Sequence, residues 1–337
     1  MSFNKKSRKT NRKESSGAFD VGEGNRLNFD LSATEQNRES LPSITIERAL
    51  QTIFKQMRAT GRRPRTISSY EFIFNDFTSK TGVKYVQEIT TDTIYDYMDM
   101  LEVALSTKLI RLKSIKAVLS RFFDNGWIQY KFWTHIQIRI DKEVKEGADE
   151  TDIAILLNVI DKTTFTGFRD AVAILLMYRT GIRITTLGNL RNKHFDFDNM
   201  EINLEGSIQK GRSLLRLPMD QQLSDHVQLL IEQNNKVRDF YGKKNDFIFI
   251  TQKGGSINNT KSNSTTLTKQ INKYANKYGI KNVNAHAIRR AYAKNLLKQG
   301  ANIALISKAL GHQDLSTTTQ YLHLDIQEVS DNLRDYL

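Results

Sequence analysis

The residues of this chain with the clearest potential for chemistry are cations, histidines and one tyrosine in its C-terminal half. They are Arg183, Lys210, His286, Arg289, His312 and Tyr321. Arg183 follows a Thr-Gly turn after an apolar helical pattern, so its guanidinium is held by a rigid element and still faces outward. Lys210 lies at or beside a hairpin turn, which can carry its amine toward a ligand.

The other candidates come from three neighbouring segments. His286 and Arg289 are spaced i, i+3 in HAIRR, so both project from one face of one helix. His312 follows Gly311 at a helix end, and Tyr321 comes nine residues later. Taken one at a time, such residues are usually surface charges, helix partners or core aromatics. They become informative only as an ordered set.

The sequence excludes several other kinds of active site. With no cysteine, the chain has no disulfide, thiolate zinc site, iron–sulfur cluster or cysteine nucleophile. It contains no G-x-x-x-x-G-K loop or G-x-G-x-x-G turn for nucleotide phosphates, and no G-x-S-x-G nucleophile elbow. The six histidines show no metal-binding spacing. We therefore expect no metal and no cofactor.

The charge of the chain indicates a polyanionic partner. Lys and Arg total 50 against 37 Asp and Glu, a formal net charge of +13 over 337 residues. Such an excess favours nucleic acid or an anionic membrane surface. The longest apolar runs, such as AVAILLMY at 171–178, are too short to cross a bilayer. The basic N-terminus lacks the apolar core of a secretory signal, so we expect a soluble intracellular protein.

Composition and periodicity divide the first half of the chain into a tail, a helical domain and a linker. Residues 1–42 are polar, with six cations in the first thirteen positions, and are predicted to form a flexible basic tail. Residues 43–138 are predicted to form about four amphipathic helices, and the charged stretch 139–150 a linker. Cations on the polar helix faces favour phosphate contact. They are Arg62, Arg63, Arg65, Lys108, Arg111, Lys113 and Lys116.

Residues 151–337 mix helical and strand patterns. Helices are predicted at 152–160, 168–181, the segment before Tyr278, 286–300, 303–311 and 314–324. Strands are predicted at 200–204, 213–219 and 246–251. The fold class is therefore mainly α with a small antiparallel β-sheet at one side of the second domain.

The six candidate residues, in their order along the chain, resemble the active-site set of the tyrosine recombinase (phage integrase) family. The matching motifs are T-G-x-R at 180–183, Lys210 ahead of L-P, H-x-x-R at 286–289, L-G-H at 310–312, and Tyr321. The intervals of 23 residues from Arg289 to His312 and of nine to Tyr321 fit that family. The resemblance covers roughly residues 43–325.

This resemblance implies a site-specific DNA recombinase built as a two-domain DNA clamp, with 43–138 as the core-binding domain and 151–337 as the catalytic domain. Tyr321 would attack the scissile phosphate and form a covalent 3′-phosphotyrosyl bond without metal or ATP. Arg183 and Arg289 would clamp the non-bridging oxygens, because a guanidinium is a planar fork of donors.

The other three residues would handle protons and geometry. Lys210 would donate a proton to the departing 5′-oxygen, and His286 would take or return the proton of the tyrosine. His312 would hydrogen-bond the phosphate. The chain departs from the family at Thr186, where an acidic residue is usual, and we expect altered tuning rather than loss of activity.

The resemblance also implies partners and a location. The partner would be double-stranded DNA with paired recombination sites, bound by a homotetramer that is monomeric or weakly associated when free. The location would be the cytoplasm, at the nucleoid, of a bacterium or of the host of a mobile element. Two alternatives stay open: a type IB topoisomerase, which shares this chemistry, and a catalytically silent DNA-binding relative.

The segment after Tyr321 carries an apolar stripe at helical spacing. The residues are Ile326, Val329, Leu333 and Leu337. A helix this short is not stable alone, so the stripe must bury against something. It is predicted to fold back onto its own domain or to dock on a neighbouring protomer, and the family resemblance favours the second.

Overall fold

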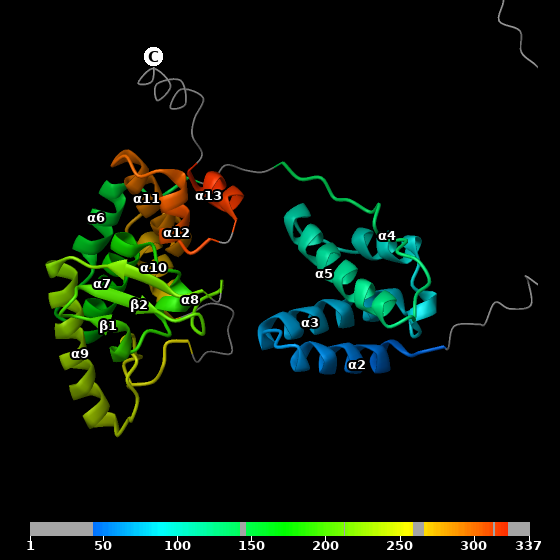
Figure 1. Cartoon of the computed structure of the whole chain (residues 1–337), viewed down its shortest axis with the longest axis horizontal. Coiled ribbons are helices and arrows are strands. Elements are labelled where there is room, and N and C mark those ends of the chain that lie inside the picture. The colour runs from blue at the N-terminus through cyan, green and yellow to red at the C-terminus, as the bar shows by residue number, and fades with distance from the viewer. Residues whose placement is uncertain (1–42, 142–145, 212, 259–265, 313, 323–337) are drawn as a thin grey trace, which may run out of the picture. The chain divides into compact units, whose positions relative to one another are not determined.

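A computed structural model describes residues 43–141, 146–211, 213–258, 266–312 and 314–322 (Figure 1). The chain divides into two compact units, Met1–Asp141 and Lys142–Leu337, and each is described by itself. The expected N-terminal tail and the apolar stripe near the C-terminus lie outside the described residues.

The first unit is helical. Its elements are α2 (Ile46–Ala59), α3 (Pro64–Thr81), the 3₁₀ turn η1 (Val86–Glu88), α4 (Thr91–Asp99) and α5 (Leu105–Asp124). The four expected helices are thus confirmed. The aromatic rings of Phe74, Phe77 and Phe122 lie at the centre of this unit and are fully buried. The ring of Phe74 lies 5.3 Å from that of Phe77 and 5.6 Å from that of Phe122, which joins α3 to α5.

Three of the cations expected to contact phosphate have partners inside this unit. Arg111 on α5 pairs with Asp76 on α3 and donates to the hydroxyl of Tyr97 on α4. Lys108 donates to the carbonyl oxygen of Met98 at 2.7 Å. Lys116 donates to carbonyl oxygens of the segment that follows α5. For these three, contact with phosphate stays a prediction, because periodicity places a residue on a face but does not show which neighbour it also contacts.

The second unit contains helices around a small sheet. The helices are α6 (Glu150–Val159), α7 (Phe165–Thr180), α8 (Ile184–Leu187), α9 (Gln221–Tyr241), α10 (Thr266–Lys277), α11 (Ala285–Lys298), α12 (Ile303–Ala309) and α13 (Leu315–Leu322), with a 3₁₀ turn η2 (Asn192–His194). The strands β1 (Phe195–Asp196), β2 (Glu201–Leu204) and β3 (Leu215–Pro218) form an antiparallel sheet in the order β1-β2-β3. Figure 1 shows α9 along one side of this unit and α11, α12 and α13 gathered at another. The expected fold class is confirmed.

The structure differs from the sequence prediction at two places in this unit. Helix α9, the longest helix of the described residues, was not predicted, although Asp220 caps its start and Gly242 ends it with φ +60°. The segment 246–251 forms only isolated bridges rather than the predicted strand. Its carbonyl oxygens accept hydrogen bonds from the side chains of Arg169, Asn234 and Arg238, which take the place of a neighbouring strand.

The segment expected to be a linker is partly packed on the second unit. Asp149 caps the start of α6 by accepting a hydrogen bond from the amide of Thr151. Ala148 is buried in the core of the second unit. No helix in the described part of the chain is long and apolar enough to cross a membrane.

Candidate active site

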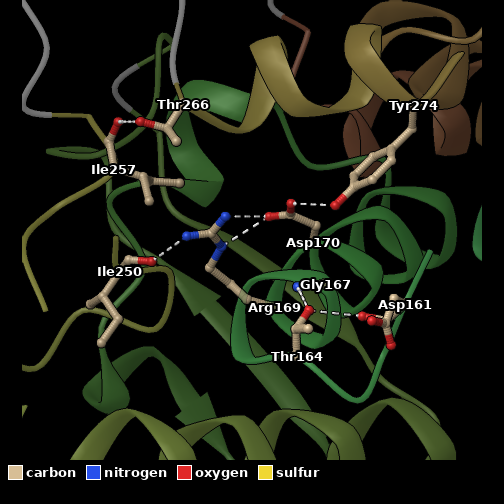
Figure 2. Close-up of polar contacts among 9 residues, drawn as sticks. All are labelled: Asp161, Thr164, Gly167, Arg169, Asp170, Ile250, Ile257, Thr266 and Tyr274. Atoms are coloured by element: carbon tan, nitrogen blue, oxygen red, sulfur yellow. Dashed lines mark hydrogen bonds and ion pairs between the residues drawn. The ribbon is translucent and has the colours of Figure 1, made fainter. Parts of the chain in front are cut away.

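Helix α7 carries the Thr-Gly-x-Arg motif at its end, and a buried ion pair fixes the helix near its start. Arg169 and Asp170 are 2% and 0% exposed. Arg169 donates to the Asp170 carboxylate at 2.6 and 2.9 Å and to the carbonyl oxygen of Ile250 at 2.7 Å. On the other side of Asp170, Figure 2 shows the hydroxyl of Tyr274 donating to the same carboxylate, at 3.3 Å. The network ties α7 to α10 and to the segment 246–251.

A left-handed glycine ends α7 and brings Arg183 into position. Gly181 has φ +61°, a conformation that glycine adopts without strain. An added Cβ would lie 2.3 Å from the ring of Tyr292 on α11, so only glycine allows this approach. Arg183 follows as the N-cap of α8, is half-buried, and donates to the carbonyl oxygen of Leu310 at 3.2 Å.

Arg289 is the most buried of the candidate residues whose side chains are described, at 3% exposure. Its guanidinium donates to the carbonyl oxygens of Gly181 and Leu310 and lies 3.1 Å from Nε2 of His312. Gly181 and Leu310 are the C-caps of α7 and α12. Carbonyls at helix C-termini lack intrahelical partners and carry partial negative charge. Two helix ends therefore hold one guanidinium fork, and Arg183 shares one of its acceptors.

The imidazole of His312 lies between Arg289 and α13. Its Nδ1 lies 2.9 Å from Oγ1 of Thr318, which is fully buried. Since an arginine can only donate, Nε2 accepts from Arg289 and the proton of the neutral ring is assigned to Nδ1. Burial, followed by the charges of Arg289 and Arg183, lowers the pKa of His312 to about 4. The ring is therefore neutral at pH 7.

His286 lies in a positive field formed by residues from three segments. It is the second residue of α11, and its amide donates to the side chain of Asn284, the N-cap of that helix. Its side chain reaches solvent, while neighbouring atoms still displace part of the water around the ring. Partial desolvation, and then the charges of surrounding cations, lower the pKa of its imidazole. Those cations are Arg290, Arg289, Arg183 and Lys210. All these effects act in one direction, so His286 is neutral at pH 7.

Lys210 lies in the turn between β2 and β3 and is exposed. Its neighbour Gln209 is 3% exposed and donates to the carbonyl oxygens of Leu204 and Ser213, at the two ends of this loop. A Cβ on Gly311 would lie 3.3 Å from Oε1 of Gln209, so the loop approaches the turn that carries His312. Nothing in the sequence marks Gln209 as a residue of the site except its place beside Lys210.

Five of the six candidates thus meet around the ends of α7, α11 and α12. The sixth, Tyr321, lies in helix α13, and its side chain is outside the described part of the structure. Thr186 is 2% exposed in α8 and follows Arg183 by less than one helical turn. Within the described residues, no group of three or more His, Cys, Asp or Glu side chains could hold a metal ion.

Comparison with known proteins identifies the family. A model described as "Phage integrase family" matches residues 148–328, more than half of the chain. The chain belongs to the phage integrase family. It is a tyrosine recombinase, and the activity of this family is to cut and rejoin DNA at specific sites. The resemblance noted in the sequence is thereby confirmed.

Individual relatives share limited identity with the chain. The tyrosine recombinase XerC of Oceanobacillus iheyensis is 26% identical over 287 residues, which cover 81% of this chain and 88% of that protein. XerD of Neisseria meningitidis serogroup B is 31% identical over 187 residues, which cover 55% of this chain and 61% of that protein.

Solved structures share the fold at lower identity. The Tn1549 transposon integrase, in complex with a circular intermediate DNA, is similar with a TM-score of 0.66 and 17% identity, covering 85% of this chain and 99% of that one. A lambda integrase dimer bound to a COC′ core site has a TM-score of 0.63 and 15% identity, covering 87% of this chain and 80% of that one.

Proposed function

We propose that Tyr321 is the nucleophile of this recombinase and that the other five candidates form the site that activates the phosphate. The observation that supports this most is the convergence of Arg183 and Arg289 on the carbonyl oxygen of Leu310. The shared acceptor is a neutral carbonyl, which brings two cations close together without itself adding a full negative charge. Two adjacent cations of fixed geometry suit the oxygens of a phosphodiester, whose charge grows in the transition state.

In the proposed reaction the phenolic oxygen of Tyr321 attacks the scissile phosphorus, and the bond to the deoxyribose 5′-oxygen breaks. The neutral imidazole of His286 accepts the phenolic proton, and Lys210 protonates the departing 5′-oxygen. His312 holds the fork of Arg289. When a phosphate is bound and accepts the donor that Arg289 gave to Nε2, the neutral ring carries its proton on Nε2 and donates to a phosphate oxygen, while Nδ1 accepts from the hydroxyl of Thr318.

The covalent product explains why rejoining needs no nucleotide. A 3′-phosphotyrosyl bond replaces one phosphodiester with another ester of similar free energy, so attack by a second 5′-hydroxyl reverses the step. The same residues then exchange protons in the opposite direction. Cleavage and ligation thus use one site.

We infer that the helical unit at 43–138 is the core-binding domain and that residues 151–337 form the catalytic domain, the two acting as a clamp on double-stranded DNA. The start of α3 supports this role. Arg62, Arg63 and Arg65 are exposed there, and Pro64 occupies the first turn. The positive end of a helix combined with exposed cations favours phosphate contact.

Recombination of two sites requires four strand cleavages, so we propose a homotetramer on paired sites that is monomeric or weakly associated when free. The lambda integrase similar to this chain is a dimer on its DNA. Residues 326–337 are proposed to dock on the neighbouring protomer. Acting on chromosomal or mobile-element DNA, the protein would be found in the cytoplasm at the nucleoid.

The test is trapping of the covalent adduct on a nicked suicide substrate, from which the short cleaved strand escapes. Tyr321→Phe removes one oxygen and should abolish the adduct, while DNA affinity stays within about threefold of wild type. An adduct formed by the Phe variant would show that another residue is the nucleophile and overturn the assignment.

A further inference from the structure

The chain enters the second unit across the helix that carries His286 and Arg289. The amide of Ala148 donates to the carbonyl oxygen of Ala287 on α11 at 3.0 Å. Ala148 is 7% exposed, so this contact lies inside the unit. The segment Glu146–Ala148, named the entry segment here, follows the boundary between the units by only a few residues.

Two side chains hold the carbonyl groups of the entry segment. Nε of Arg290 donates to the carbonyl oxygen of Glu146 at 2.8 Å, and Arg290 is 9% exposed. Nδ2 of Asn282, three residues before α11, donates to the carbonyl oxygen of Gly147 at 2.9 Å. Both contacts are to the main chain, so they depend on where the segment lies and not on which side chains it carries.

Gly147 is the point of closest approach between the entry segment and α11. A Cβ at this position would lie 2.9 Å from the amide nitrogen of Ala291 and 3.2 Å from the carbonyl carbon of Arg290. Both are backbone atoms of the helix and cannot swing aside as a side chain would. Any larger residue must therefore lift the segment away from the helix.

The contacts of the entry segment and the catalytic candidates share the first turns of α11. The entry segment contacts Ala287, Arg290 and Ala291. His286 and Arg289 lie on the same turns, next to these residues in the sequence. Along the same side, a cavity of about 520 Å³ is lined by the entry segment, Tyr178 and the second half of α11. The segment therefore packs against α11 on one side and has open space on the other, and the hydrogen bonds hold it on the helix.

We propose that Arg290 is a positioning residue and that the docked entry segment sets the placement of His286 and Arg289 for cleavage. This proposal rests on the roles proposed above for those two residues. The charge of Arg290 also lowers the pKa of His286, after desolvation and together with Arg289, Arg183 and Lys210. A substitution at Arg290 therefore alters both the placement of His286 and Arg289 and the electrostatic field at His286.

Two variants test the proposal from opposite sides of the contact. Arg290→Met removes the donor and the charge, and Gly147→Ala lifts the entry segment without changing any charge. Each is expected to slow single-turnover adduct formation at saturating DNA by about ten- to a hundredfold, because small displacements of catalytic groups have effects of this size. In Arg290→Met, the acid limb of the rate profile should move to higher pH, because His286 loses a neighbouring cation and protonates more easily.

Matched controls are available on both elements. Glu146→Ala leaves the carbonyl that Arg290 binds, and Lys294→Met removes a cation one helical turn further along α11. Both should react within about twofold of wild type. Binding of the DNA and urea unfolding are measured for all four variants.

Wild-type rates for Gly147→Ala and Arg290→Met would overturn the proposal, and so would an equal loss in Glu146→Ala. General unfolding of both test variants would also overturn it, because the contact would then serve folding alone. If only Arg290→Met unfolds, the rate of Gly147→Ala decides. An adduct that persists in Tyr321→Phe would instead refute the proposed function, whatever the outcome for the entry segment.

Discussion

Replacement of Arg289 by lysine should separate the role of the guanidinium fork from the role of its charge. The fork of Arg289 contacts the carbonyl oxygens of Gly181 and Leu310 and Nε2 of His312. A lysine keeps the positive charge but replaces the planar fork with a single ammonium group on a shorter reach. It can satisfy one or two of these acceptors. Arg183 still donates to Leu310, so the carbonyl of Gly181 is the acceptor most exposed to loss.

The size of the effect follows from these contacts. A buried acceptor left without a donor costs about 1–3 kcal/mol, which is the expected loss in unfolding free energy. Loss of a positioned donor to the transition state costs about two to three orders of magnitude in rate. With the fork itself distorted, we expect cleavage by Arg289→Lys to fall by about two to four orders, or about 3–5 kcal/mol of activation free energy.

Arg183→Lys is the matched comparison. This residue is half-buried, so water can replace part of what its guanidinium donates. Its cleavage rate should fall by a similar factor of about two to four orders, but its unfolding free energy by less than about 1 kcal/mol. The assay combines single-turnover adduct formation with urea unfolding. A folded Arg289→Lys protein that cleaves within about threefold of wild type would refute the proposed clamp.

Three further outcomes are expected, two from the geometry of the site and one from the sequence pattern after Tyr321. The depressed pKa of His312, about 4 against 6.5, means that the unfolded chain takes up a proton first as the pH falls. The contribution of His312 to stability should therefore be constant well above pH 6.5 and fall by at most about 3 kcal/mol toward pH 4. In urea titrations His312→Gln should lose this part of the drop, whereas the parts due to His194 and His286, whose pKa values are also lowered, should remain. Inorganic sulfate should raise Tm by binding between Arg183 and Arg289, with about 1.4 kcal/mol at ten times Kd, and an unchanged Tm would argue against an anion site. Deleting residues 326–337 should leave half-site binding intact but weaken full-site complexes on native gels; equal loss of both would favour packing of that segment on its own domain.

Local patterns predicted the elements of the fold well where helices carry a clear apolar stripe. The helices α2 to α5 were found because their buried residues repeat at spacings of three and four. The segment 246–251 was wrongly predicted as a strand, because its buried residues show no such spacing. Ile248, Phe249 and Ile250 are consecutive and all fully buried, a pattern shared by a strand and by a loop that runs through a core. Which of the two forms depends on the side chains of α7 and α9 that bind its carbonyls.

The candidate residues could be selected from their order in the sequence, but their contacts could not. No spacing rule indicates that Thr318 faces the ring of His312, or that Gln209 spans the loop of Lys210. Such contacts lie inside loops without periodicity or depend on how a short helix turns back onto the residues before it. The same is true of Arg290, which no pattern in the sequence selects and which is 9% exposed in the structure.

The arrangement of Arg289 also explains why its site is assembled from helix ends. An arginine that paired with a buried carboxylate would have its charge neutralised, and its attraction for a phosphate would be reduced. The carbonyls of Gly181 and Leu310 orient the fork through partial charges at the C-termini of α7 and α12, and these two acceptors add no full negative charge. Residues 181, 289 and 310 reach one another only through the packing of α7, α11 and α12. Strand cleavage is therefore expected to slow wherever that packing loosens, as it should when the entry segment is lifted from α11, well before the protein unfolds.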